Sequence, residues 1–356
     1  MDAFIRGMPK AELHVHVEGT LEPELRVRLA ERNGVELPYR TADELAASYA
    51  YQDLSSFLAL YFSGMDVLRT EQDFFELTYA YLQRVHAQNV VYTEMHFDPQ
   101  AHTSRGIAFD TVISGIRRAQ EMAQDELGIR SQLILGILRD MSAESAMEAL
   151  EQSLAYRDWI VGVGLDSDEK GNPPVKFREV FERARAEGYK LTMHCDHLQE
   201  NSVEHIRQCL DVIGVDRIDH GYHVLDDEGL IDDVRRRHMC LTFCTTSNPS
   251  DPAPRRAAEL KRALELGLNV TVNTDDPAYM RSYYLSEVLL NTQQAVGLSR
   301  EQVAELARNA FRSAWIGEGR GRRTLMTCIC HIKALFPICS TTLRVRNLAF
   351  QGLPMS

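Results

Sequence analysis

Leu13-His14-Val15-His16-Val17 is the stretch of sequence that decides the fold of this chain. Successive side chains of a β-strand point to opposite faces, so residues two apart share one face. His14 and His16 would therefore project two imidazoles in the same direction from an apolar strand. Such a pair is half of a metal site, although two histidines hydrogen-bonded within a core would show the same alternation. The turn and helix signals of residues 18–23 follow directly, which places the pair at the carboxyl end of the strand.

Seven further apolar runs follow, and each is succeeded by a stretch with helical periodicity. The predicted strands cover residues 11–17, 90–97, 132–138, 160–165, 190–194, 217–220, 240–244 and 269–273. Buried strands that alternate with covering helices indicate a parallel sheet, and eight such units predict a (β/α)8 TIM barrel. Residues 42–85, after the first strand, are rich in aromatic residues and predict a helical insertion. No linker divides residues 1–316, so we expect a single barrel domain there.

The C-terminal segment differs from the rest in charge. Residues 317–356 contain six Lys/Arg and one acidic residue, a net charge of +5, whereas residues 1–316 carry −17 of the overall −12. The segment shows no clear helical period. Its single Cys-x-Cys-His run, residues 328–331, lacks the second ligand pair of a zinc site. We expect an atypical basic tail that is disordered or non-native.

Composition restricts the class of partner. A net charge of −12 and a pI near 5.5 argue against nucleic acid or an anionic membrane surface as partner. No apolar run approaches the roughly 18 residues of a membrane span, and residues 1–9 lack the apolar core of a signal peptide. Seven cysteines without framework spacing fit reduced thiols. We predict a cytoplasmic protein with a small-molecule ligand, and leave open its assembly into a homo-oligomer.

Three of the later strands end in polar residues that suit a catalytic site. They are His194-Cys195-Asp196 at the end of the fifth, Asp219-His220-Gly221 at the end of the sixth and Asn273-Thr274-Asp275-Asp276 at the end of the eighth. Because the carboxyl ends of barrel strands converge on one face, these groups should meet the first histidine pair. Three histidines and a carboxylate suit zinc, which in catalytic sites keeps a position for water. Taken singly, His194 has an alternative as a core histidine and Asp275 as a helix N-cap.

Three motifs occur in order along the chain. They are Pro9-Lys10-Ala11-Glu12-Leu13-His14-Val15-His16-Val17-Glu18-Gly19-Thr20, Arg217-Ile218-Asp219-His220-Gly221 and Val272-Asn273-Thr274-Asp275-Asp276-Pro277. Their combination resembles the adenosine/adenine deaminase family of the amidohydrolase superfamily, over residues 9–315. The resemblance implies one zinc ion per subunit, held by His14, His16, His194 and Asp275. It also implies that His220 orients and activates the metal-bound water, and that Gly19 and Asp276 contact the purine.

Hydrolytic deamination needs a hydroxide and an acid. Zinc lowers the pKa of bound water from about 15.7 to about 7, and an acid that protonates the ring nitrogen contributes roughly 10²- to 10⁴-fold. The family usually has a Glu three residues after the strand-five histidine, where this chain has His197. A longer turn would bring Glu200 near that position, so we expect Glu200 to be the proton donor, with Asp196 as the alternative. Alternatively, Glu200 has only a structural role, as a carboxylate in the first turn of the next helix, where the helix dipole favours negative charge.

Two stretches resemble the branch of the family that acts on free adenine. They are Phe97-Asp98-Pro99-Gln100 and Gly164-Leu165-Asp166-Ser167. Adenosine deaminases usually carry glycine at the position of Ser167, and a side chain there would fill space that a ribose needs. The expected function is zinc-dependent deamination of adenine to hypoxanthine and ammonia, as in purine salvage. The alternatives are deamination of adenosine or of an N6-substituted adenine of the cytokinin type, a different metal-dependent hydrolase, and a catalytically silent purine-binding protein.

Overall fold

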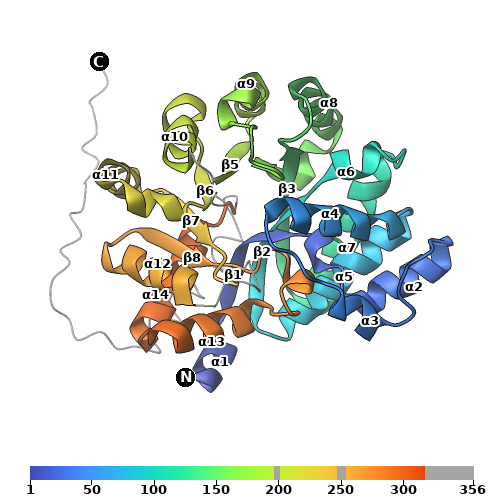
Figure 1. Ribbon diagram of the computed structural model, residues 1–356, viewed down its shortest axis with the longest axis horizontal. Coiled ribbons are helices and arrows are strands. Elements are labelled where there is room, and N and C mark those ends of the chain that lie inside the picture. The colour runs from blue at the N-terminus through green and yellow to red at the C-terminus, as the bar shows by residue number, and fades with distance from the viewer. Residues whose placement is uncertain (196–200, 247–253, 317–356) are drawn as a thin grey trace, which may run out of the picture.

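The fold is a barrel of eight parallel strands, which neighbour one another in sequence order (Figure 1). The computed structural model describes residues 1–195, 201–246 and 254–316. The strands are β1 (Lys10–His16), β2 (Val90–Phe97), β3 (Arg130–Leu138), β4 (Ile160–Asp166), β5 (Lys190–Cys195), β6 (Arg217–His220), β7 (Cys240–Phe243) and β8 (Asn269–Val272). The TIM-barrel prediction is confirmed, and each predicted strand boundary lies within two residues of the observed one.

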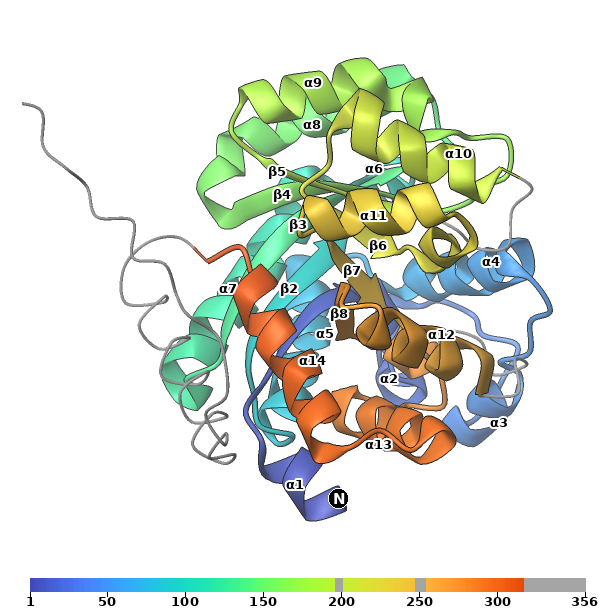
Figure 2. The ribbon, with the colours of Figure 1, turned by 90° about the vertical axis from the view of Figure 1, so that its left-hand side faces the viewer.

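Helices surround the strands in both views (Figure 1, Figure 2). They are α1 (Asp2–Gly7), α2 (Pro23–Asn33), α3 (Ala42–Ala47), α4 (Leu54–Gly64), α5 (Glu71–His86), α6 (Pro99–Thr103), α7 (Phe109–Leu127), α8 (Ala143–Ser153), α9 (Arg178–Ala186), α10 (Ser202–Arg207), α11 (Glu228–Arg236), α12 (Pro254–Glu265), α13 (Leu285–Val296) and α14 (Arg300–Ser313). None of these described helices is long and apolar enough to cross a membrane.

Helices α3, α4 and α5, which follow α2 between β1 and β2, occupy the predicted insertion. Capping boxes begin two of them, Asp53 with Ser56 at α4 and Thr70 with Asp73 at α5, because each pair satisfies otherwise unpaired backbone N–H groups. Helix α5 packs against α7 in the outer ring. The division into a barrel and a tail stays a prediction, since residues 317–356 lie outside the described part of the chain.

Contacts between the first and last strands close the barrel. Val15 forms a parallel bridge with Asp275, in which His16 N donates to Asp275 O at 3.0 Å and Asp275 N donates to His14 O at 3.2 Å. Two residues earlier on each of the two segments, Leu13 N donates to the side-chain oxygen of Asn273 at 2.9 Å. The backbone that carries the first histidine pair is thereby joined to the backbone of Asp275.

The barrel interior contains a buried ion pair. Arg217 on β6 donates to Glu94 Oε2 on β2 at 2.6 Å, and both side chains are fully buried. The guanidinium also lies 3.8 Å from the ring centroid of Trp315, which follows α14. Breaking such a pair by removing one partner leaves an uncompensated buried charge. Glu94 thus links opposite strands of the barrel to the segment after its last helix.

Replacement of Glu94 by Ala should therefore destabilise the protein by about 3–5 kcal/mol. The measurement is the free energy of unfolding from urea denaturation. The matched control is Glu182→Ala, which removes an exposed i,i+4 partner of Arg178 and should cost no more than about 0.5 kcal/mol. Equal losses in the free energy of unfolding for the two substitutions would show that the buried ion pair stabilises the protein no more than an exposed one.

Candidate active site

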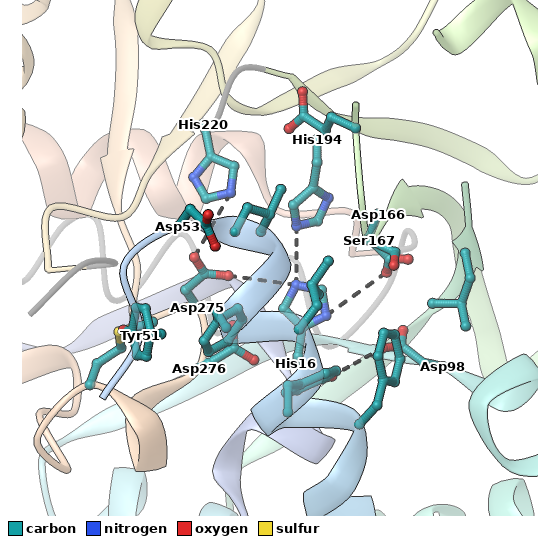
Figure 3. A pocket seen from close by; sticks show the side chains of 18 residues that line it. His16, Tyr51, Asp53, Asp98, Asp166, Ser167, His194, His220, Asp275 and Asp276 are labelled. Carbon is teal, nitrogen blue, oxygen red and sulfur yellow. Dashed lines mark hydrogen bonds and ion pairs between the residues drawn. The ribbon is translucent and has the colours of Figure 1, made fainter. Parts of the chain in front are cut away.

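Four side chains from three parts of the barrel meet at the carboxyl ends of the strands. They are His14 and His16 on β1, His194 on β5 and Asp275 after β8, and one potential ligand atom from each lies within 4.8 Å of the others. His14 Nε2 lies 3.2 Å and His16 Nε2 3.6 Å from Asp275 Oδ1. His16 Nε2 and His194 Nε2 are 3.1 Å apart (Figure 3). The structure thus brings together the four residues that the sequence suggested as metal ligands.

The hydrogen bonds of these residues suit a metal cation. His194 Nδ1 faces the carbonyl oxygen of Leu165 at 3.0 Å, which accepts its proton and leaves the Nε2 lone pair directed into the cluster. His14 Nδ1 is likewise held by the hydroxyl of Thr242 at 2.9 Å. Lone pairs on buried nitrogens that face each other and a carboxylate repel unless a cation lies between them. Three imidazole nitrogens and one carboxylate oxygen are the donor set of a mononuclear catalytic metal site.

Asp219 lies beneath the cluster. Its two oxygens are 3.7 Å from His14 Nδ1 and 3.7 Å from His194 Nδ1, and they accept hydrogen bonds from Thr192 and Thr242. Burial alone would raise the pKa of Asp219, but the facing imidazoles outweigh it and hold that pKa well below its usual value. Asp219 is therefore a carboxylate that lies behind the histidines and is linked to His14 through the Thr242 hydroxyl.

His220 and Asp276 flank the cluster on its open side. His220 Nε2 lies 3.8 Å from Asp275 Oδ2, and Asp276 is buried with Oδ1 lacking a hydrogen-bond partner in the described residues (Figure 3). A Cβ on Gly19 would lie 2.0 Å from that Oδ1. Gly19 does not line the pocket in the described part of the chain. Its role in the structure is to leave space for the Asp276 side chain, which any side chain at residue 19 would displace. Burial, together with the negative charge of Asp275, raises the pKa of Asp276.

Three residues at the ends of different strands have left-handed backbone conformations. Their φ angles are +73° at Ser167, +64° at His220 and +65° at Asp275. Residues other than glycine pay about 1–3 kcal/mol for such a conformation, and such strain clusters at functional sites. All three side chains line the same pocket.

The opposite wall of the pocket carries two more carboxyl groups, Asp98 after β2 and Asp166 at the end of β4 (Figure 3). Tyr61 on α4 donates to Asp98 Oδ2 at 3.0 Å. Burial, with the nearby negative charge of Glu18, raises the pKa of Asp98 to about 6. Burial and the charge of Asp98 also raise the pKa of Asp166. In the sequence, Asp98 and Asp166 stand out only as parts of two stretches that resemble a branch of the family, and no catalytic or binding role was predicted for either.

Apolar and aromatic side chains cover the pocket from α4. Leu54, Phe57, Leu58 and Tyr61 lie over it, and Tyr51 and Met280 complete this cover. An apolar cover above a polar floor suits a flat heteroaromatic ring with polar edges.

The expected proton donor Glu200 and its alternative Asp196 lie outside the described residues, as does His197.

Two interior residues near the cluster had no role predicted from sequence: Asp219 was named only among the polar residues of the sixth strand, and His96 was not singled out. Asp219 shares a face of β6 with Arg217, and polar residues two apart within a buried strand would have signalled an interior network. His96 on β2 is fully buried, with Nε2 3.7 Å from Asp219 Oδ2 and its ring stacked against that of His16. Its place at the end of an apolar strand was the available signal.

Comparisons with known proteins agree with this geometry. A deaminase of Schizosaccharomyces pombe, described as uncharacterized, is 48% identical over 318 residues, which cover 89% of this chain and 94% of that protein. An adenine deaminase of Chlorobium phaeobacteroides is 47% identical over 318 residues, with coverage of 89% and 94%. The crystal structure of adenine deaminase from Arthrobacter aurescens has 40% identity and a TM-score of 0.87, and covers 93% of this chain and 100% of that one. Residues 9–331 match the family described as adenosine deaminase, and, as the three motifs predicted, this chain belongs to that family.

Proposed function

We propose that this protein is a zinc-dependent adenine deaminase, which hydrolyses adenine to hypoxanthine and ammonia. The observation that carries the proposal is the buried His14, His16, His194 and Asp275 cluster at the floor of a covered pocket. Family membership supports deamination of a purine, and the relatives named adenine deaminase support the free base. Adenosine, an N6-substituted adenine and catalytically silent purine binding are not favoured by these comparisons.

The donor set fits one zinc ion, which would supply Lewis-acid activation of water near neutral pH. His220 lies beside Asp275 on the open side of the cluster, where it would orient the attacking water and take its proton. Asp276, with a buried oxygen that has no hydrogen-bond partner among the residues the structure describes, would hold a ring nitrogen of the purine. Glu200 would protonate the ring nitrogen next to the carbon under attack, and the amino group would then accept a proton and leave as ammonia.

Ser167 would favour the free base over the nucleoside. Its side chain lines the pocket, its buried hydroxyl has no partner within residues 1–195, 201–246 and 254–316, and its φ of +73° would suit glycine better. A serine maintained in a conformation that costs about 1–2 kcal/mol suggests that the side chain itself has a function. Filling the space that a ribose would occupy is such a function. A cytoplasmic location and assembly into a homo-oligomer stay predictions.

The metal prediction is tested by metal content. Purified protein should contain one zinc per chain, and removal of zinc by a chelator should abolish ammonia release from adenine until zinc is added back. His16→Ala should lose zinc and reduce kcat/KM by more than the roughly 10- to 100-fold cost of an outer-shell change. His86→Ala, at an exposed histidine on α5, is the control and should retain both. Full activity in zinc-free protein would contradict the proposal.

The acid is tested with two substitutions in the segment after β5. Glu200→Gln should lower kcat for adenine about 10²- to 10⁴-fold while zinc content and the unfolding midpoint stay unchanged. Asp196→Asn is the paired variant and should retain most activity. A loss confined to Asp196→Asn would assign the proton donor to Asp196 instead.

The role of Ser167 is tested by replacing it with glycine. Ser167→Gly should stabilise the fold by about 1 kcal/mol, because the left-handed backbone is no longer strained. It should also reduce the ratio of kcat/KM for adenine to that for adenosine at least 10-fold. Ser282→Gly, at a serine with φ of +53° outside the pocket lining, should leave that ratio unchanged. An unaltered ratio in Ser167→Gly would reject the steric explanation.

A further inference from the structure

The pocket wall that carries Asp98 and Asp166 faces the proposed metal cluster, and neither carboxyl group has a role in the proposed deamination. We propose that Asp98 and Asp166 form a receptor for the N–H group on the imidazole edge of an unsubstituted purine, and that this receptor excludes purines with a substituent on that nitrogen. The proposal rests on the proposed function and extends it to the residues that set substrate class.

Three adjacent strands bring the two carboxyl groups together. Asp98 follows β2, Asp166 ends β4, and Gly136 lies on β3 between them. A Cβ at Gly136 would lie 2.3 Å from Asp98 Oδ1 and 2.6 Å from Asp166 Oδ2. Both oxygens therefore occupy the space above the Gly136 backbone, and any side chain there would push them apart. The absence of a side chain on β3 is what makes room for the pair.

Apart from each other, the paired carboxyl groups lack donors in the described part of the protein. Asp98 and Asp166 are each 2% exposed and share a side-chain hydrogen bond, which requires one proton between them. No other N–H or O–H group of the described residues donates to Asp98 Oδ1 or to either oxygen of Asp166. Buried carboxylates are normally paired or hydrogen-bonded, because loss of water without replacement is costly. The adjacent Ser167 hydroxyl is also buried and has no partner among the described residues. One shared proton leaves acceptor positions on this wall for a ligand that supplies an N–H donor.

The separation from the metal cluster matches a two-ring base. The imidazole of His16 lies between the two regions, with Nε2 turned toward His194 and Asp275 and Nδ1 3.9 Å from Asp166 Oδ2 (Figure 3). Asp166 is therefore about one aromatic ring away from the ligand atoms. A purine whose amino-bearing carbon lies at the cluster would extend its imidazole edge toward this wall.

The chemistry of that edge distinguishes free bases from nucleosides. Free adenine carries a hydrogen on an imidazole nitrogen, and a carboxylate accepts that hydrogen in a charge-assisted bond. In a nucleoside the same nitrogen is bonded to a sugar carbon, so the two carboxyl groups would keep only their shared proton and receive no hydrogen bond from the ligand. Sites built to hydrogen-bond a group reject analogues that lack it far more strongly than apolar pockets reject extra bulk.

A second cation site is another interpretation of the same side chains. One atom each from His16, Asp98 and Asp166 lies within 4.8 Å of the others. The imidazole of His16 is already directed by Nε2 into the first cluster, which leaves this set with two carboxylates and one shared ring. The proposal therefore takes an N–H donor as the ligand, and makes a second metal equivalent one of the outcomes that would overturn it.

The test measures binding as well as turnover, with the full-length, zinc-loaded protein. Calorimetry compares hypoxanthine with 9-methylhypoxanthine, and kinetics compares adenine with 9-methyladenine. Asp98→Asn and Asp166→Asn should each weaken hypoxanthine binding about 10- to 100-fold, the scale of a lost hydrogen bond to a charged group. Binding of the 9-methyl probe should change less than threefold, so selectivity for the free base should fall. Asp168→Asn, in the same loop but outside the pocket lining, should change neither.

Other outcomes separate this proposal from the proposed function. Equal weakening of both probes with loss of zinc would mean that Asp166 only supports His16, and would overturn the receptor. A second zinc equivalent that disappears in both variants would also overturn it. If the unaltered protein deaminates no purine but binds hypoxanthine selectively through both acids, the receptor stands and the proposed function fails. If it deaminates adenine and 9-methyladenine equally well, the proposed reaction stands and the receptor is wrong.

Discussion

The backbone bridge between Val15 and Asp275 is the constraint on which the rest of the structure depends. It closes the barrel, and its backbone hydrogen bonds join three of the four residues proposed as metal ligands, His14, His16 and Asp275. A slip of one residue in the pairing of β1 would turn both histidines to the other face of the strand. The register that completes the sheet is therefore the register that assembles the site. Closure and chemistry cannot vary independently in this fold.

Polar groups inside the barrel differ in how fully they are hydrogen-bonded. Glu12 accepts hydrogen bonds from Thr274 and from Tyr81 at 2.6 Å, and Arg217 pairs with Glu94. Among the described residues, buried side-chain atoms without a hydrogen-bond partner occur at the pocket, as on Ser167 and Asp276, and also away from it, as on Thr78 and Gln120. Those that line the pocket are the ones that a polar ligand can reach.

Part of the backbone strain lies at the same pocket. Ser167, His220 and Asp275 have left-handed backbones at the ends of β4, β6 and β8 and line the pocket, whereas other described residues with such backbones, such as Asn89 and Ser282, lie outside its lining. The well-packed strands below them supply the stability that offsets this cost, since residues such as Leu133, Leu165 and Leu241 are fully buried. A rigid barrel thus holds its carboxyl-end residues in conformations that they would not adopt alone.

The sequence by itself determined the strands and pointed to the strand ends as the site. Continuous apolar runs such as β3 are typical of strands buried on both faces, and the pairing of His14 with His16 follows from the two-residue period of a strand. Barrel topology predicted that the polar residues at the ends of the fifth, sixth and eighth strands would meet that pair. The resemblance of three motifs to a known family then selected His194 and Asp275 among them as the proposed metal ligands.

Only the tertiary structure decided which other polar residues share the site. Asp98 and Asp166 meet because β2 and β4 flank a glycine on β3, and Asp219 lies under the histidines because of the register between β5 and β6. In the sequence, a carboxylate at the end of a strand looks the same whether it faces solvent, a cap or a pocket. Which of these it faces is set by residues far away in the chain, through strand register and through space left by a missing side chain.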